Sequence, residues 1–232
     1  MALAKAVIES QLTSRFGDVF KVADRHFIDV LPTGIAEIDL LAGGLPRGAL
    51  TEIFGSASSG RTSLTLSALA HATVNEEVCA LVDLSNSLDP QSASKAGVVL
   101  DQLLWLRCDN KLENAFKAAD LILQGGGFGL VVLDLGDLPS VQVRKIISSW
   151  WYRFRRVLEN QPTALLVVAQ DSCVRSCASL SLALTKAAEN WTSAVPTATC
   201  HARLLQGLTL ESERQRPILP GQRTATFQVQ IP

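Results

Sequence analysis

Residues 51–66 read TEIFGSASSGRTSLTL, which is a short apolar strand, a loop of small residues and the start of a helix. The loop places Gly55 and Gly60 at the G-x-x-x-x-G spacing of a phosphate-binding loop. Glycines there let backbone N–H groups point at an anion, and the following helix adds the positive end of its dipole. Arg61 occupies the position at which such loops carry lysine, and Thr62 supplies the hydroxyl that holds Mg²⁺. The stretch therefore predicts a phosphate cradle in which a planar guanidinium replaces a compact ammonium.

On both sides of this loop, apolar segments alternate with amphipathic ones. The apolar segments predict strands at 51–54, 78–84, 103–106, 130–135 and 164–170. The amphipathic segments predict helices at 62–72, 90–96, 112–124 and 139–158. Strands that are apolar on both faces and joined by helices indicate an α/β protein, with a parallel sheet covered on each side. Two further strands, at 202–211 and 224–231, predict an antiparallel hairpin, whereas residues 171–191 are expected to be partly helical.

Composition limits the classes of protein to which the chain can belong. Its 232 residues suit one α/β domain with a small appendage, and 47% hydrophobic residues exclude a disordered chain. The net charge of −1 provides no overall positive field, so any contact with nucleic acid needs a local patch. The N-terminus carries acidic and polar residues where a secretion signal needs an apolar run, and no stretch of about 18 apolar residues occurs. We therefore expect a cytoplasmic protein with no membrane segment.

The cysteines show no pattern that indicates a disulfide framework or a metal site. Five cysteines are an odd number, and their spacing matches no common framework. Cys173, Cys177, Cys200 and His201 fit the spacing of no common zinc finger. The interpretation that we favour is small, buried, reduced thiols and no metal.

The first residues predict an amphipathic helix that precedes the main domain. Residues 2–16 end before Gly17 and place their apolar side chains on one helical face. These side chains, which are candidates for contact with a partner, are Leu3, Val7, Ile8, Leu12 and Phe16. We therefore divide the chain into an N-terminal helical arm at 1–25 and a core domain at 26–232.

Residues 32–70 read PTGIAEIDLLAGGLPRGALTEIFGSASSGRTSLTLSALA and resemble the opening of the bacterial recombinase RecA and its relatives. The resemblance continues in order through residues 82–108, 130–135 and 164–170, and it covers residues 1–171. It implies a RecA-like three-layer α/β sandwich with a mainly parallel central sheet, antiparallel C-terminal strands and the N-terminal helical arm. It also implies that the arm packs against a neighbouring subunit, since recombinase subunits use theirs in this way.

The resemblance assigns a degenerate nucleotide site to Gly55, Gly60, Arg61, Thr62, Asp134 and Gln170. Asp134 matches the aspartate that supports Mg²⁺ in the family, and Gln170 matches the polar sensor on the next strand. The glutamate that activates water corresponds to Ser85, and the tyrosine that stacks on adenine corresponds to Ser92. A serine hydroxyl takes no proton near neutral pH without a base beside it, and Asp83 is the candidate for that base. We therefore expect a degenerate ATPase with no catalytic residues, in which any binding of ATP and Mg²⁺ is weak.

The two DNA-binding loops of recombinases have no counterpart in this sequence. Only LGDLPS separates Asp134 from the next predicted helix, and the segment after Gln170 contains no glycine. Because these loops contact the single strand in recombinases, we expect no strand-exchange activity.

The predicted helix at 139–158 combines an apolar stripe with basic residues. The stripe consists of Val143, Ile147, Trp150, Phe154 and Val157. The basic residues on its other faces are Arg144, Lys145, Arg153, Arg155 and Arg156, with Trp151 and Tyr152 beside them. They form either a contact patch for DNA or protein, or a solvated face with Trp151 in the core, and both interpretations stay open. A second basic group is interpreted as solvated surface: Arg203, Arg214, Arg216 and Arg223.

Within the RecA-like group, the short chain, the altered site and the absent loops resemble the ImuA branch. Proteins of this branch are accessory factors of a bacterial damage-inducible mutagenesis cassette, so the resemblance implies a non-catalytic adaptor of the SOS response in translesion synthesis. It implies contacts with RecA, with an ImuB-like protein and with an error-prone polymerase, and it leaves self-association and direct DNA contact open. The alternatives are a RecA-paralogue ATPase that regulates recombination, and a cell-division inhibitor.

Overall fold

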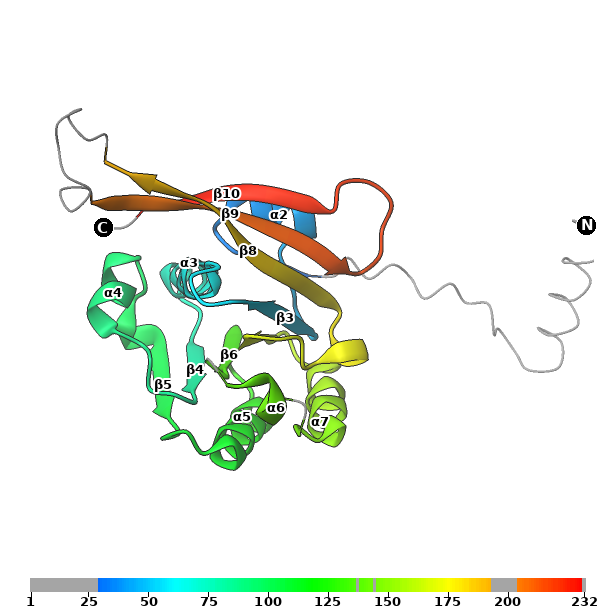
Figure 1. Cartoon of the computed structure of the whole chain (residues 1–232). Coiled ribbons are helices and arrows are strands. Elements are labelled where there is room, and N and C mark those ends of the chain that lie inside the picture. The colour runs from blue at the N-terminus through cyan, green and yellow to red at the C-terminus, as the bar shows by residue number, and fades with distance from the viewer. Residues whose placement is uncertain (1–28, 137, 144, 193–203, 231–232) are drawn as a thin grey trace, which may run out of the picture.

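The computed structural model describes residues 29–136, 138–143, 145–192 and 204–230 (Figure 1). The predicted N-terminal arm at 1–25, with its apolar side chains, lies outside the described residues. Arg144 and Arg203, two predicted members of the basic groups, lie outside them as well. The division of the chain after residue 25 therefore stays a prediction.

An eight-stranded sheet forms the centre of the described part of the chain, in the order β10-β9-β8-β3-β7-β6-β4-β5. Its strands are β3 (Leu50–Gly55), β4 (Cys79–Asp83), β5 (Leu103–Arg107), β6 (Leu130–Asp134), β7 (Ala164–Ala169), β8 (Leu180–Trp191), β9 (Leu205–Arg216) and β10 (Thr224–Gln230). Neighbouring strands from β8 through β3 to β5 run parallel, whereas β9 is antiparallel to both β8 and β10. The predicted α/β class, with a mainly parallel sheet and antiparallel C-terminal strands, is confirmed.

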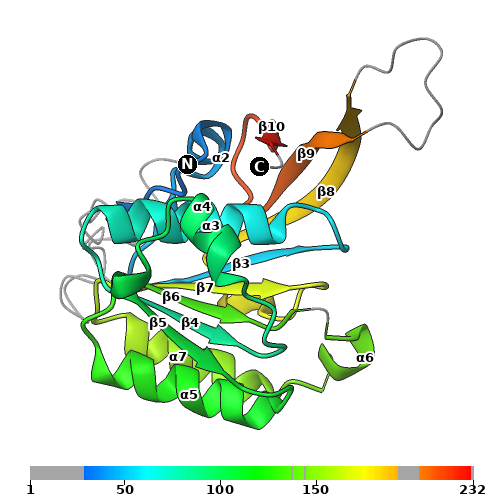
Figure 2. The same cartoon turned by 90° about the vertical axis from the view of Figure 1, so that its left-hand side faces the viewer.

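Helices cover both faces of this sheet and complete three layers (Figure 2). One face carries α2 (Ala36–Ala42), α3 (Arg61–Val74) and α4 (Pro90–Lys95), and the other carries α5 (Leu112–Gly125) and α7 (Ser148–Leu158). The central strands supply both cores in alternation, so that Val131 and Leu133 of β6 enter one core while Leu130 and Val132 enter the other. This double burial explains why the parallel strands are continuous apolar runs. The shorter elements are β1 (Val30–Leu31), β2 (Leu45–Pro46), η1 (Leu100–Gln102), α6 (Ser140–Val143) and η2 (Arg175–Cys177).

The prediction of a single helix at 139–158 is wrong, because the chain forms two helices, α6 and α7, with a break between them. Ile147, which precedes α7, is extended, with φ −70° and ψ 125°. The break falls where two isoleucines precede two serines, and both residue types favour a helix less than straight-chain residues do. Ile147 is consequently 67% exposed and does not belong to the predicted apolar stripe. The other four stripe residues contact the core: Val143, Trp150, Phe154 and Val157.

The strand β8 was not predicted, because residues 171–191 were expected to be partly helical. Leu180, Leu182 and Leu184 alternate into the core with the period of a strand. The second half of β8 contains Lys, Ala and Glu, which favour helices, and it is extended because it pairs with β9. β9 also extends further than predicted, to Arg216, so the connection to β10 comprises residues 217–223.

Candidate functional site

The phosphate-loop motif folds as a strand, a loop and a helix, with the expected glycine geometry. β3 ends at Gly55 and α3 begins at Arg61, while Gly60 caps α3 in the left-handed conformation with φ 91°. A Cβ on Gly55 would lie 2.2 Å from the carbonyl oxygen of Leu184. A Cβ on Gly60 would lie 2.2 Å from Cδ1 of Leu210. Both positions therefore need glycine because they lie close to β8 and β9, and Gly60 needs it also because of its left-handed backbone.

The loop presents groups that suit a phosphate. Residues 56–58 are exposed, and the 14-residue helix α3 follows with the positive end of its dipole. Ser59 is 1% exposed, and its hydroxyl has no hydrogen-bond partner among the described residues. Thr62 is exposed on the first turn of α3, and Asp134 and Gln170 stand at the ends of β6 and β7. The loop thus fits a phosphate group, and Thr62 with Asp134 would hold a Mg²⁺ ion beside it.

Three positions of the predicted site converge on one glycine. Arg61 donates a hydrogen bond from Nη1 to the carbonyl oxygen of Gly136 at 3.0 Å. The N–H of Gly136 donates to Oδ1 of Asp134 at 2.7 Å. Gly136 has φ 58°, and a Cβ on it would lie 2.3 Å from the hydroxyl oxygen of Ser85. Arg61 and Asp134 hold the backbone of Gly136 by hydrogen bonds, and Ser85 leaves no room for a side chain on it; we call this arrangement the Gly136 clamp.

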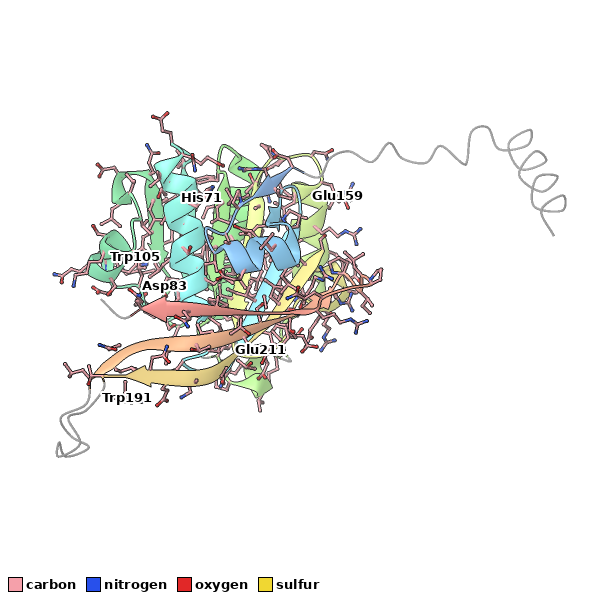
Figure 3. All side chains as sticks on the ribbon, turned by 90° about the horizontal axis from the view of Figure 1, so that it is seen from above. His71, Asp83, Trp105, Glu159, Trp191 and Glu211 are labelled. Carbon is pink, nitrogen blue, oxygen red and sulfur yellow. The ribbon has the colours of Figure 1, made fainter. Side chains whose placement is uncertain are left out.

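Asp83 is engaged in structural hydrogen bonds and does not act as a base for Ser85. Asp83 is 1% exposed, and its carboxylate accepts hydrogen bonds from the N–H groups of Ser87 at 3.1 Å and Leu88 at 3.0 Å. It also accepts one from Nε1 of Trp105 at 3.2 Å, and the two side chains lie next to each other in Figure 3. Within the described ranges, no carboxylate or imidazole forms a hydrogen bond with the Ser85 hydroxyl. In the described part of the chain, Ser85 therefore has no base bound to its hydroxyl.

Ser92, which corresponds to the adenine-stacking tyrosine, is bound to the residue that caps α4. Asp89 caps α4 by accepting hydrogen bonds from the N–H of Ser92 at 3.0 Å and from its hydroxyl at 2.6 Å. The hydrogen bond from the Ser92 side chain lowers the pKa of Asp89 below its ordinary value. A cavity of about 250 Å³ extends from Thr62 and Asp134 to this cap. Its apolar lining consists of leucines rather than an aromatic ring, so an adenine would find no stacking platform there.

A buried glutamate that was not predicted as a site residue holds the segment after β7 against the sheet. Glu52 of β3 is 0% exposed, and Oε1 accepts hydrogen bonds from the N–H groups of Cys173 and Val174. Oε2 accepts hydrogen bonds from the hydroxyls of Ser172 at 2.9 Å and Ser181 at 3.3 Å. The single carboxylate inside the apolar strand TEIF was the sequence feature that could have identified Glu52.

The predicted basic patch on α7 is partly neutralised within the molecule. Arg153 donates hydrogen bonds from Nε and Nη2 to both carboxylate oxygens of Asp120, each at 2.6 Å. Arg155 forms an ion pair with Glu159 at 3.3 Å. Trp151 is 2% exposed, so of its two interpretations the core position is the observed one. The residues of this surface that are exposed and take part in neither ion pair are Lys145, Tyr152 and Arg156.

The second basic group contains one residue that is not solvated surface. Arg214 donates hydrogen bonds from Nη1 to the carbonyl oxygen of Leu41 at 2.6 Å and from Nη2 to that of Gln222 at 3.2 Å. It therefore ties β9 to the end of α2 and to the turn before β10. Arg216 and Arg223 are exposed on either side of that turn.

The described residues include no cluster of three metal-ligating side chains. Cys173 and Cys177 are buried free thiols, and desolvation raises the pKa of both. Cys200 and His201 lie outside the described residues. In the same ranges, no helix has the length and apolar character needed to cross a membrane.

Comparison with known proteins gives matches to the RecA family. The sequence profile of the RecA N-terminal domain matches residues 2–140. The chain is 46% identical to Protein RecA of Methylococcus capsulatus over 122 residues, which cover 52% of this chain and 34% of that protein. It is 39% identical to Protein RecA of Xanthomonas axonopodis pv. citri over 156 residues, which cover 58% and 45% of the two chains. For Protein RecA of Cutibacterium acnes the identity is 36% over 137 residues, covering 57% and 39%. The chain thus matches less than half the length of each of these relatives.

Proposed function

Because the chain belongs to the RecA N-terminal domain family, we propose that it acts in DNA repair or recombination as an adaptor that does not hydrolyse ATP. The Gly136 clamp is the observation that carries this proposal. In a hydrolysing phosphate loop, the cation at position 61 contacts phosphate, and the residue at position 85 activates water. In this chain the Arg61 side chain donates a hydrogen bond to Gly136, and Ser85 occupies the space beside Gly136.

The clamp also predicts how the loop would treat a nucleotide. A phosphate in the loop would have to compete with the carbonyl oxygen of Gly136 for the Arg61 guanidinium, which weakens binding. Ser85 has no hydrogen-bonded base among the described residues, so we expect this position to take no proton from water. Without an aromatic side chain at Ser92, the base would contribute little affinity. We therefore expect weak binding of ATP and Mg²⁺, and no turnover.

We place the adaptor in translesion synthesis, with RecA, an ImuB-like protein and an error-prone polymerase as partners. The short connection between β6 and α6, and the hydrogen bonds that Glu52 accepts from the segment after β7, support a role without strand exchange. The N-terminal arm, with Leu3, Val7, Ile8, Leu12 and Phe16, would dock on RecA or on another copy. The adaptor would then cap or decorate a recombinase filament and bring the polymerase complex to damaged DNA.

Phosphate release tests the central part of this proposal. Purified chain with ATP and Mg²⁺ should release phosphate no faster than its Arg61→Ala variant does. A rate well above background that Arg61→Ala abolishes would show an active ATPase and contradict the proposal. Calorimetric titration with ATP, with and without Mg²⁺, measures the expected weak binding. Capture by RecA, repeated after removal of residues 1–20, tests the arm, and unchanged capture rules out docking through it.

An ATPase that regulates recombination is the second candidate. The observation in its favour is the preserved phosphate loop, in which Gly55, Gly60 and Thr62 keep the geometry of a binding site next to Asp134. Phosphate release separates the two candidates, because the adaptor requires none.

A further inference from the structure

An exposed surface that is rich in arginine surrounds η2, the short helix before β8. η2 packs against α7, and both contribute to the core on the same face of the sheet. Burial raises the pKa of the Cys177 thiol of η2, and the Arg155 and Tyr152 side chains beside it oppose that rise. Tyr152 and Arg156 are four positions apart on α7, so they share the helical face that borders η2. Arg175 is exposed on η2 itself, so the two helices present arginine and tyrosine side chains to solvent together.

A bulge in β9 adds another arginine to this surface. Leu182 of β8 pairs with Arg214, and the Leu182 side chain enters the core on the α3 side of the sheet. The register then shifts, and the residue before it, Ser181, pairs with Arg216. Residues that pair across antiparallel strands lie on the same face, and Ser181 faces Glu52, on the side of α7 and η2. The bulge therefore turns Arg216 toward η2, whereas a regular strand would place it on the face of Arg214.

The turn that follows Arg216 adds exposed aliphatic side chains. Ile218 is 78% exposed and Leu219 is 47% exposed, and prolines on both sides of this pair restrict the backbone. Nη2 of Arg214 donates a hydrogen bond to the carbonyl oxygen of Gln222 at 3.2 Å, which holds the base of the turn. A turn held in this way loses little conformational entropy on binding. In Figure 1 the turn, η2 (the short yellow helix) and α7 lie on the same side of the molecule. We call the following residues the arginine surface: Tyr152, Arg156, Arg175, Arg216, Ile218 and Leu219.

The charge of the arginine surface indicates a negatively charged partner. Within the described residues, the guanidinium groups of Arg156, Arg175 and Arg216 form no ion pair or hydrogen bond. Glu159 borders the surface, but it pairs with Arg155. The chain as a whole has a net charge of −1, so the positive potential is local. A single tyrosine ring offers little for the stacking of bases, whereas the two aliphatic side chains gain from burial against apolar groups. The surface therefore suits an acidic protein segment with apolar side chains rather than a nucleic acid.

We propose that the arginine surface binds an acidic segment of a partner protein, with carboxylates on the arginines and apolar side chains packed on Ile218 and Leu219. Arginine suits this contact because its planar fork binds a carboxylate through two hydrogen bonds. Arginine and tyrosine are also among the side chains that dominate the binding energy of protein interfaces. The inference assigns a docking surface that the adaptor role leaves open, and it does not depend on that role.

Fluorescence anisotropy tests the proposal with a labelled synthetic peptide in which leucines alternate with aspartates, at protein concentrations up to about 100 µM. The wild-type chain should bind this peptide. Arg156→Glu and Arg216→Glu lie on different elements, and each should weaken binding by about tenfold or more, because each sets a like charge against the peptide. Ile218→Asp should weaken binding by about tenfold as well, since it removes apolar contact area. Lys95→Glu is the matched control, because Lys95 is exposed on α4, on the other face of the sheet, and its reversal changes the net charge equally. It should bind like the wild type.

Two further probes separate apolar contact from charge, and protein from nucleic acid. A peptide with glycines in place of the leucines should bind about tenfold more weakly, and a labelled single-stranded oligodeoxynucleotide of the same charge should bind no more tightly than the glycine peptide. No binding of the leucine peptide, equal binding of the glycine peptide, or tighter binding of the oligonucleotide overturns the proposal. Unchanged binding by Arg156→Glu and Arg216→Glu, or equal loss in Lys95→Glu, overturns it as well. Thermal unfolding verifies that each variant is folded, and Arg175→Glu replaces an arginine variant that does not fold.

Discussion

Replacing Glu52 with alanine should strongly destabilise the protein, because Glu52 is buried and accepts hydrogen bonds from two backbone N–H groups. The carboxylate accepts hydrogen bonds from the buried N–H groups of Cys173 and Val174 and from two serine hydroxyls. The hydroxyls can rotate toward other acceptors, but the two N–H groups are fixed by the backbone. Each buried donor left without a partner costs about 1–3 kcal/mol, so we expect Glu52→Ala to lose about 2–6 kcal/mol. That is a large part of the roughly 5–15 kcal/mol by which a domain is stable.

The matched control is Glu52→Gln, which keeps the shape of the side chain. Its amide oxygen can accept from Cys173 and Val174, and its NH₂ group can donate to the serine hydroxyls. Only the extra strength of a charged acceptor is lost, which amounts to about 1–2 kcal/mol. Urea unfolding measures both variants through the midpoint and the slope of the transition. Hydrogen exchange at the amides of Cys173 and Val174 should accelerate in Glu52→Ala alone. If Glu52→Ala lies within about 1 kcal/mol of the wild type, or if Glu52→Gln is equally damaging, the reasoning fails.

Three other outcomes follow from contacts described above. Gly136→Ala should lose about 1–2 kcal/mol for the left-handed backbone, plus a penalty for the clash with Ser85. Adding Ser85→Ala to Gly136→Ala should restore only the part of the unfolding free energy that the clash removes, as measured by urea unfolding. Complete recovery of the wild-type stability would argue against backbone strain at position 136. Burial raises the pKa of the Cys79 thiol from 9.0 to about 12, so above pH 9.0 the unfolded chain releases this proton first and stability falls as pH rises. This thiol adds up to about 1.4 kcal/mol per pH unit to the fall of the unfolding free energy above pH 9.0. Cys79→Ala should remove that contribution. If the unfolding free energy of the variant falls as steeply with pH as that of the wild type, Cys79 is not the group responsible. Arg153→Ala should lower the free energy of unfolding by about 1 kcal/mol or less, since Arg153 is half exposed. In a double-mutant cycle, adding Asp120→Ala to Arg153→Ala should lower it little further, because the ion pair is already lost.

The parallel part of the sheet could be predicted because each strand carries its own evidence. Residues 130–133 and 164–169 are apolar at every position, and an apolar run this short favours a strand buried on both faces. β8 lacks such local evidence, because its second half has the composition of a helix. Its extended conformation depends on pairing with β9, which begins more than ten residues later. The break before α7 is also invisible to periodicity, since Ile147 has the correct spacing for the stripe although its side chain is exposed.

Motif spacing identified most residues of the candidate site but not what they contact. Arg61, Ser85 and Asp134 lie on three different segments, and the sequence shows only that two of them differ from the family pattern. Their meeting at Gly136 requires the order of the strands, which places the ends of β3, β4 and β6 along one edge of the sheet. Glu52 escaped notice for a related reason. Its four donors come from residues 172–181, more than a hundred positions further along the chain.

The clamp links the altered positions to one another in physical terms. Gly136 leaves so little room that a Cβ on it would lie 2.3 Å from the Ser85 hydroxyl oxygen. A longer side chain at position 85 would have to turn away or displace Gly136, and with it the carbonyl oxygen that Arg61 binds. Conversely, the lysine of an active loop carries a compact charge on a single nitrogen and lacks the planar fork of arginine. An arginine at 61 and a serine at 85 therefore support the same loop conformation, so a substitution at either position alone would leave the other residue beside Gly136.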